Sequence, residues 1–308
     1  MRAPWNRPHR PSNGGHSFHS VRTIDLTIII VSWNVREALL CNLACLFSTK
    51  DMVVREVIVI DNASSDQSAA AVREQFPEAR VIENDWNAGF AAAVNQGLRC
   101  ARGRHILLLN PDMLVREGAL DRLVQCLEQN KRIGVLGGKL ESHDGTVVQS
   151  VRRDPGIVDQ LAIALKVPHI FPSVLRRYLA GDLDLSRSQS VDQLRGSFFA
   201  FSRSVADLVG PFDEGYYLWF EEVDFCRRVR EAGLLVHFEA NICAEDAVGL
   251  SFAQVSTRRK QRLFMRSQRY YFKKWNGWGA YLLFVVVTPL AIIAGTFHDA
   301  ARWMRNQI

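Results

Sequence analysis

Residues 26–34 read LTIIIVSWN, and this stretch decides the fold class. Its first six residues form a continuous apolar run rich in β-branched side chains, which is typical of a strand buried on both faces of a sheet. Similar runs follow at 56–60 (EVIVI) and 105–109 (HILLL). Helical patterns separate these runs, and alternating strands and helices predict a parallel α/β sheet over the first 140 residues.

Weaker patterns complete the expected element order. We expect short strands at 80–82, 134–136 and 198–201, and helices at 36–47, 67–76, 88–101, 117–129, 203–209 and about 220–232. Asp66 is the expected N-cap of the helix at 67–76. Residues 155–192 are irregular and are interpreted as an insertion near the site. The chain thus divides into a disordered basic arm at 1–22, a domain at 23–252 and a tail at 253–308.

The net charge of +6 is distributed unevenly. Residues 1–22 hold four Arg and no acid, residues 23–251 hold 24 Lys/Arg against 31 Asp/Glu, and residues 252–308 hold ten Lys/Arg against one acid. The acidic body argues against binding to the phosphate backbone of a nucleic acid. The basic tail suits the anionic surface of a membrane.

The tail contains an uncharged run at 278–297, WGAYLLFVVVTPLAIIAGTF, that is close to the length of a membrane-spanning helix. Eight Lys and Arg residues at 258–274 precede it, and aromatic residues mark the junction: Tyr270, Tyr271, Trp275 and Trp278. This order is expected at the cytoplasmic face of a membrane. Pro289 weakens a simple spanning helix, and Arg302 and Arg305 follow the run. We expect membrane association, by a spanning helix or by a monotopic or re-entrant hairpin, rather than a buried core helix.

Polar side chains stand at the carboxyl ends of the predicted strands, where ligands bind in open α/β sheets. No Gly-x-Gly-x-x-Gly follows the first strand, which argues against a dinucleotide-dependent oxidoreductase. The sequence also lacks a P-loop and a Gly-x-Ser-x-Gly elbow. The remaining interpretation is a carboxylate-rich sheet edge that suits a nucleotide and a divalent cation.

Four ordered stretches carry a family resemblance: IIIVSWN, VIVIDNASSD, ENDWNAGFAAAVNQGLRCARGRHILLLNPDM and GSFFAFSRSVADLVGPFDEGYYLWFEEVDFCRRVREAGL. Over residues 25–252 the chain resembles family 2 glycosyltransferases, and most of all the bacterial rhamnosyltransferases of cell-surface polysaccharide synthesis. The resemblance implies the GT-A fold, with its Rossmann-like mixed sheet. It also implies a nucleotide-diphosphate sugar donor and a requirement for Mg²⁺ or Mn²⁺.

The resemblance assigns a set of residues to donor binding: Ser32, Asn34, Asp61, Asn87, Gly89, Asn95 and Asn110. Asp61 matches the residue that the family uses for the nucleotide, with Asp66 as a second candidate. A purely structural alternative for Asp61 is an Asx turn. Gly89 begins a helix whose free N–H groups can approach a phosphate, or it serves only backbone geometry.

The metal site is expected at Asp112, which stands where the family's Asp-x-Asp motif ends. Asn110 takes the place of the first Asp of that motif. Asp246 occupies the position at which many relatives carry a His that binds the metal or the pyrophosphate. An aspartate can also ligate a hard cation through oxygen, although it adds negative charge beside a diphosphate.

The acidic stretch WFEEVDF matches the family's acidic pair, and the resemblance makes Glu222 the general base, with Glu221 second. Adjacent helical residues point about 100° apart, so only one of the pair readily faces the acceptor. Asp224 and Arg227 are expected to support the site, and Asp213 matches a family position near the acceptor.

The sequence therefore predicts an inverting, metal-dependent glycosyltransferase at the cytoplasmic face of the cell membrane. Its expected partners are a nucleotide-diphosphate sugar, membrane lipid and a polyprenyl-diphosphate-linked or polysaccharide acceptor, with no nucleic acid. The branch resemblance suggests rhamnose from a dTDP donor. The alternatives are a transferase of the same fold that acts on a soluble or protein acceptor, and a membrane-anchored scaffold that has lost turnover through Asp246.

Overall fold

The computed structural model describes residues 23–246 and 257–305, with side chains described as far as residue 293. The expected arm at 1–22 lies outside these residues. The strands are β1 (Leu26–Ser32), β2 (Arg55–Asp61), β3 (Arg80–Glu83), β4 (His105–Leu109), β5 (Met113–Val115), β6 (Ile133–Glu141), β7 (Val147–Val148), β8 (Val151–Arg152), β9 (Gln189–Ser190), β10 (Gln193–Leu194), β11 (Phe198–Ser202) and β12 (Leu235–Asp246). The helices are α1 (Arg36–Ser48), α2 (Ser68–Gln75), α3 (Phe90–Cys100), α4 (Ala119–Gln129), α5 (Ile157–Ala164), α6 (Arg203–Val209), α7 (Glu221–Glu231) and α9 (Thr257–Arg305), with 3-10 turns η1 (Val167–His169) and η2 (Pro172–Leu175).

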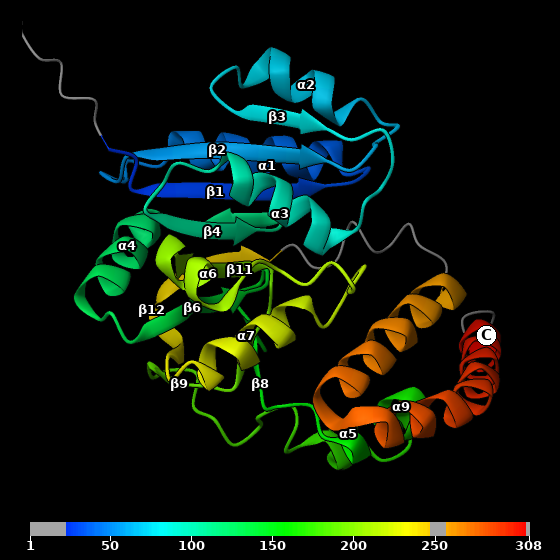
Figure 1. The fold of residues 1–308 in the computed structure, drawn as a ribbon. Coiled ribbons are helices and arrows are strands. Elements are labelled where there is room, and N and C mark those ends of the chain that lie inside the picture. The colour runs from blue at the N-terminus through cyan, green and yellow to red at the C-terminus, as the bar shows by residue number, and fades with distance from the viewer. Residues whose placement is uncertain (1–22, 247–256, 306–308) are drawn as a thin grey trace, which may run out of the picture.

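The main sheet is mixed and has the order β3-β2-β1-β4-β11-β6-β12-β5 (Figure 1). β1 pairs in parallel with β2 and β4, and β2 pairs in parallel with β3, as expected. β11 is antiparallel to both β4 and β6, and β5 is antiparallel to β12. The mixed sheet implied by the family resemblance is thus confirmed, and within the described residues 23–140 only the three-residue strand β5 departs from the expected parallel pairing, because it turns back directly after β4.

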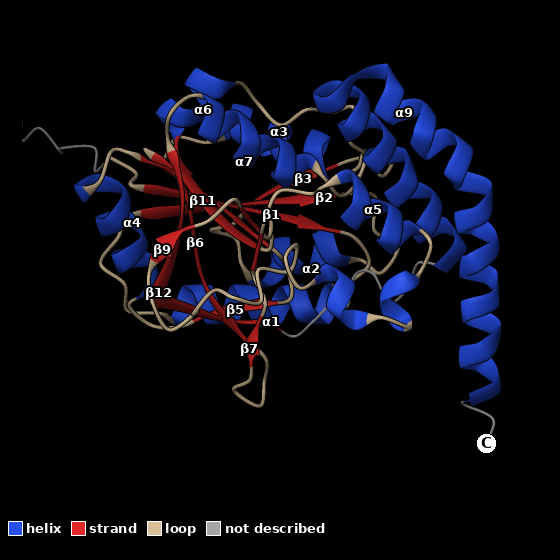
Figure 2. Cartoon of the chain, turned by 90° about the horizontal axis from the view of Figure 1, so that it is seen from below, coloured by secondary structure: helices blue, strands red, loops and turns tan. Residues whose placement is uncertain are grey.

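Helices cover both faces of the sheet (Figure 2). Alternate residues of the central strands divide between two cores, as a side-chain period of two requires. Ile28 and Ile30 pack with α1, α2 and α4, whereas Ile29 packs with α3 and α7. The second core includes stacked rings of Phe212 and Phe225, with centroids 4.6 Å apart. Two buried faces explain why the central strands are apolar throughout.

Two parts of the fold depart from the sequence-based expectations. β6 extends to Glu141, beyond the expected 134–136, because β12 pairs in parallel with β6 from Ile133 to Glu141. β12 itself was not among the expected elements, although residues 236–242 (VHFEANI) alternate apolar and polar side chains as in a half-buried strand. The Asp66 carboxylate accepts the N–H of Ser68, although Gln67, in a left-handed conformation, is the residue that precedes α2.

Helix α9 lies on one side of the molecule against α5 (Figures 1 and 2). It is divided at Gly277, whose φ of 81° and ψ of −174° interrupt the helix. The two halves pack against each other: the rings of Phe272 and Phe284 stack with centroids 4.5 Å apart, and Gln261 donates a hydrogen bond to the carbonyl of Ala291 at 2.6 Å. We call residues 258–293 the α9 hairpin.

Candidate active site

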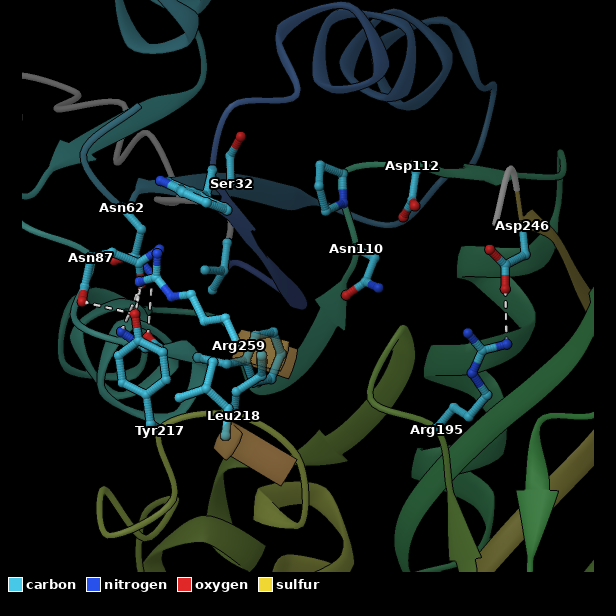
Figure 3. A pocket seen from close by; sticks show the side chains of 16 residues that line it. Ser32, Asn62, Asn87, Asn110, Asp112, Arg195, Tyr217, Leu218, Asp246 and Arg259 are labelled. Atoms are coloured by element: carbon cyan, nitrogen blue, oxygen red, sulfur yellow. Dashed lines mark hydrogen bonds and ion pairs between the residues drawn. The ribbon is translucent and has the colours of Figure 1, made fainter. Parts of the chain in front are cut away.

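A cavity opens where β1 and β4 end, and its lining comes from distant parts of the chain (Figure 3). Seven polar residues among those that line it are Ser32, Asn62, Asn87, Asn110, Asp112, Tyr217 and Asp246. Two arginines also line it, Arg195 before β11 and Arg259 in α9. The carboxyl end of a parallel β-sheet is the position at which such folds bind their ligands.

The loop before α3 forms one wall of this cavity. The side-chain oxygen of Asn87 accepts hydrogen bonds from the Gly89 N–H and the Tyr217 hydroxyl, both at 3.0 Å. Gly89 has a φ of 86°, and a Cβ there would lie 2.5 Å from the carbonyl oxygen of Tyr217. Only glycine fits this conformation and this close approach. The structural role of Gly89 is thus clear, and it shapes the cavity wall.

Asp112 and Asp246 meet at the opposite wall (Figure 3). The pairing of β5 with β12 places Asp246 across from Met113, so Asp246 lies at the end of β12 beside the residue that follows Asp112. Both are buried, with exposed fractions of 5% and 2%. Arg195 forms an ion pair with Asp246 at 3.0 Å. This pair offsets the extra negative charge that the aspartate brings to the position.

The chemistry of this wall fits a hard divalent cation. Asp112, Asp246 and the Asn110 amide offer oxygen atoms, which Mg²⁺ and Mn²⁺ prefer. Among residues 23–246 and 258–293, no cluster of three or more His, Cys, Asp or Glu side chains could enclose a metal alone. An ion of this kind typically completes its coordination with water and the phosphates of a ligand. The residues therefore fit a cation that binds together with a diphosphate.

A second cavity of about 760 Å³ adjoins the first. The two cavities share four lining residues, namely Phe90, Asn110, Arg195 and Leu218. Both glutamates of the acidic stretch, Glu221 and Glu222, line the second cavity, together with Arg152, Tyr178 and Phe264. A ligand in the first cavity can therefore meet a ligand in the second beside the start of α7.

The backbone before α7 sets the position of these glutamates. Trp219 and Phe220 both have left-handed conformations, with φ of 65° and 71°. Such conformations cost non-glycine residues about 1–2 kcal/mol each, and they often occur where a functional side chain must be placed. They turn the chain so that α7 begins with Glu221 and Glu222 at the cavity.

The two glutamates are set to hold protons more tightly than usual. Burial raises the pKa of Glu221 well above its ordinary value, and the neighbouring Glu222 raises it further. Burial also raises the pKa of Glu222, while Arg152 and Arg195 lower it. Glu222 is therefore the member of the pair whose charge has cationic neighbours. A carboxylate with a raised pKa is a stronger base than an exposed one.

Three of the expected donor residues do not line the cavity. The Asp61 carboxylate accepts hydrogen bonds from the N–H and the hydroxyl of Ser64, three residues further along, and so closes a local turn. The Asn34 side chain accepts the N–H of Ser65 at 2.7 Å. Asn95 joins α3 to the loop before α7, because its amide binds both the carbonyl and the N–H of Phe212. Ser32, Asn87, Gly89 and Asn110 do line it.

The expected supporting residues hold α9 instead of lining either cavity. Asp213 accepts hydrogen bonds from Tyr270 at 3.2 Å and from Lys274 at 2.7 Å. Asp224 is fully buried and also binds Lys274. The guanidinium of Arg227 lies over the ring of Trp275, 4.3 Å from its centroid. These residues support the site by fixing the tail to α7.

Sequence reasoning missed the cationic residues of the site. Arg195 directly precedes the quoted GSFFAF stretch, so its position was available as a signal. Arg259 was counted only within the basic tail, and Arg152 lies in a region without a recognisable pattern. No periodicity predicts that α9 returns to the sheet edge. These three arginines reach the site only through contacts between segments that are far apart in the sequence.

The mixed sheet, with a polar cavity at its carboxyl edge, has the architecture of the GT-A fold. Two solved structures share this fold. One is a mannosyltransferase from Pyrobaculum calidifontis in complex with GDP-Man and Mn²⁺, with a TM-score of 0.56, 19% identity, and coverage of 90% of this chain and 74% of that one. The other is GalNAc-T7 with UDP, GalNAc and Mn²⁺, with a TM-score of 0.58, 14% identity, and coverage of 82% and 51%.

The sequence model described as Glycosyl transferase family 2 matches residues 27–207, and the chain belongs to this family. The N-acetylglucosaminyl-diphospho-decaprenol L-rhamnosyltransferase of Mycobacterium tuberculosis is 28% identical over 192 residues, which cover 58% of this chain and 62% of that protein. A low-salt glycan biosynthesis hexosyltransferase of Haloferax volcanii is 25% identical over 217 residues, which cover 68% and 63%. The match thus spans less than two thirds of either relative.

Proposed function

We propose that this protein transfers a sugar with inversion from a nucleotide-diphosphate donor to a hydroxyl of a lipid-linked acceptor. One observation carries the proposal: the Asp112–Asp246 wall and the Glu221–Glu222 pair lie in two adjoining cavities that share Asn110 and Arg195. The first cavity accommodates the donor, and the second accommodates the acceptor. The reacting centres then meet beside Asn110.

In this proposal Glu222 removes the proton from the acceptor hydroxyl. The oxygen attacks the anomeric carbon, and the bond to the nucleotide diphosphate breaks on the opposite face. The burial that raises the pKa of Glu222 favours its acceptance of the proton. Asp112, Asp246 and Asn110 would hold the cation, which neutralises negative charge on the diphosphate when bound. Arg259 and Arg195 add positive charge on the same cavity.

We further propose a dTDP-linked rhamnose donor and a polyprenyl-diphosphate-linked acceptor in cell-envelope glycan synthesis. The similarity to the M. tuberculosis rhamnosyltransferase, whose name specifies a decaprenol-linked acceptor, supports this choice. The α9 hairpin supports it as well, since its basic and apolar character suits the cytoplasmic face of a membrane. An amphiphilic acceptor would be concentrated at that face.

The test is a transfer assay on the full chain in mild detergent, with a panel of nucleotide sugars and a short-chain polyprenyl-diphosphate acceptor. We expect dTDP-rhamnose to be used, and we expect Glu222→Gln to lower kcat about 10²–10⁴-fold. Asp112→Ala should abolish turnover as well. Glu117→Gln is the matched control, because Glu117 is exposed and lines neither cavity. Full activity in both site variants would refute the assignment.

A further inference from the structure

The second half of α9 presents large apolar side chains to the outside. Their exposed fractions are 62% for Trp278, 56% for Leu282, 71% for Val286, 58% for Leu290 and 51% for Ile293. These positions recur every three or four residues, so they lie along one face of the helix. A contiguous apolar face of this kind is unusual on a soluble surface and marks an interaction site.

The opposite face of the same segment is held by the protein. Ala280, Phe284 and Ala291 are buried, and Ala291 packs with Met265 and with Ala164 of α5. The hydroxyl of Thr288 accepts a hydrogen bond from Arg269 at 3.0 Å. The apolar segment is thus fixed along its length, antiparallel to the first half of α9.

The first half of α9 is strongly basic. Four of its exposed cations, Arg258, Arg262, Arg266 and Lys273, are spaced by four, four and seven residues, which places these four near one face of the helix. The ammonium of Lys273 lies 4.1 Å from the centroid of the Trp278 ring, at the point where the chain reverses. A basic helix therefore runs beside an apolar one, with an aromatic residue at the junction, which is complementary to anionic headgroups above a hydrocarbon layer.

We propose that the α9 hairpin lies in the plane of the membrane interface, with its apolar face in the outer part of the hydrocarbon layer. A spanning orientation would draw the antiparallel basic half and α5 into the bilayer, and buried arginines there are strongly disfavoured. The alternative of separating the two halves would break the Gln261, Arg269 and Phe284 contacts. In-plane binding preserves every one of these contacts.

This placement has a consequence for the acceptor that rests on the proposed function. The helix that touches lipid also supplies Phe264 to the acceptor cavity, and Arg259 and Leu263 to the donor cavity. A lipid-linked acceptor can then reach the second cavity along α9 without leaving the interface. A spanning helix would give no such continuous path.

The test measures the depth of three labels in lipid. Single cysteines at Leu282, Val286 and Leu290, made in a Cys41→Ser background because Cys41 is exposed, carry an environment-sensitive dye. The full chain is bound to phosphatidylcholine vesicles with about one third phosphatidylglycerol, and quenching by lipids spin-labelled at different depths is recorded. In-plane binding places all three labels at one shallow depth. A spanning helix would separate the first and last labels by about 12 Å in depth, and this result would overturn the proposal.

A charge on the exposed face provides the second arm. Val286→Asp should lower the vesicle-bound fraction about tenfold, whereas Leu208→Asp, on an equally exposed apolar residue of α6, should not change it. Unchanged binding of Val286→Asp would refute the proposal. A dimer in which the dyes are shielded from water without lipid would also refute it, because a second copy of the chain would then cover the apolar face. Sugar transfer in detergent is measured in parallel: its absence in all proteins would sink the proposed function while the depth result stands.

Discussion

The ammonium group of Lys274 in α9 lies 2.8 Å from a carboxylate oxygen of Asp224 in α7, whose side chain is fully buried. The same ammonium lies 2.7 Å from Asp213, and the indole N–H of Trp275 reaches the same oxygen of Asp224 at 2.9 Å. The tail is thus bound to the helix that begins with the two glutamates of the site. Removing it would also remove walls of both cavities, so point substitutions are the appropriate probes.

Lys274→Ala should lower the free energy of unfolding by about 1–3 kcal/mol, because a buried carboxylate loses a charged hydrogen-bond partner. Asp224 retains Arg228 at 2.9 Å, which limits the loss. Denaturant unfolding in detergent measures the effect. Lys273→Ala is the matched control, since the Lys273 ammonium lies over the exposed ring of Trp278 and near the half-buried ring of Tyr281, away from Asp224. An equal loss in both variants would contradict the prediction.

Arg259→Ala should raise the KM for the donor about 10–100-fold, because its guanidinium reaches into the donor cavity towards Asn62 and Asn87 (Figure 3). The KM for the acceptor should change little. Arg258→Ala serves as control, because Arg258 is exposed and lines neither cavity. Initial rates at varied donor concentration give the answer, and equal effects of the two variants would show that general tail charge, not this contact, is responsible.

Arg195→Met should raise the donor KM about tenfold or more, because it leaves the buried charge of Asp246 facing a diphosphate. Adding Asp246→Asn removes that charge, so the double variant should recover part of the donor affinity. A double-mutant cycle on donor binding should give a coupling of about 1–3 kcal/mol. Strict additivity would mean that the pair does not balance charge in the donor cavity.

Glu221→Gln should stabilise the protein increasingly as the pH rises. The pKa of Glu221 is raised on folding above its ordinary value of 4.5, so the folded state binds the proton more tightly than the unfolded state. Between these two pKa values ionisation of Glu221 lowers the stability of the wild type with rising pH, by about 1.4 kcal/mol per pH unit, and the variant lacks this contribution. Thermal unfolding at pH 4 to 8 tests this, with Glu117→Gln as a control that should show no such trend. A difference between Glu221→Gln and wild type that does not change with pH would contradict it.

Chelation with EDTA should abolish transfer, and Mn²⁺ or Mg²⁺ should restore it. Asp112→Ala should shift the metal concentration for half-maximal donor binding upwards at least about tenfold, because one charged oxygen ligand is lost. Asp85→Ala is a suitable control, since Asp85 is exposed outside the cavity. Donor binding by calorimetry at varied metal concentration is the measurement. Metal-independent binding would refute the metal site.

Local sequence patterns predicted most of the fold. The apolar runs at β1, β2 and β4 were recognised because strands buried on both faces need apolar residues throughout. β12 was missed although residues 236–242 (VHFEANI) alternate apolar and polar side chains, and its place in the sheet depends on its parallel pairings with β6. Those pairings join segments more than one hundred residues apart in the chain.

The candidate site was also predicted in part from the sequence. Ser32, Asn87, Asn110, Asp112, Glu221 and Glu222 were all identified from motifs, and the structure brings them to two adjoining cavities. Asn95 was assigned to donor binding from its place in the motif. The motif does not reveal which face of α3 this residue occupies, so it could not show whether Asn95 lines the cavity. The fold turns it towards Phe212, where a buried amide finds its hydrogen bonds.

The sequence by itself determined the family, the strand ends that carry the ligand groups, and a basic and apolar tail, because these depend on residue type and local periodicity. Only the tertiary structure decided that Arg195 offsets Asp246, that Asp213 and Asp224 bind Lys274, and that the first half of α9 joins the active-site wall. Ion pairs and helix packing depend on distances between residues far apart in the chain. Those distances are fixed by the packing of the whole domain, and local sequence patterns do not encode them.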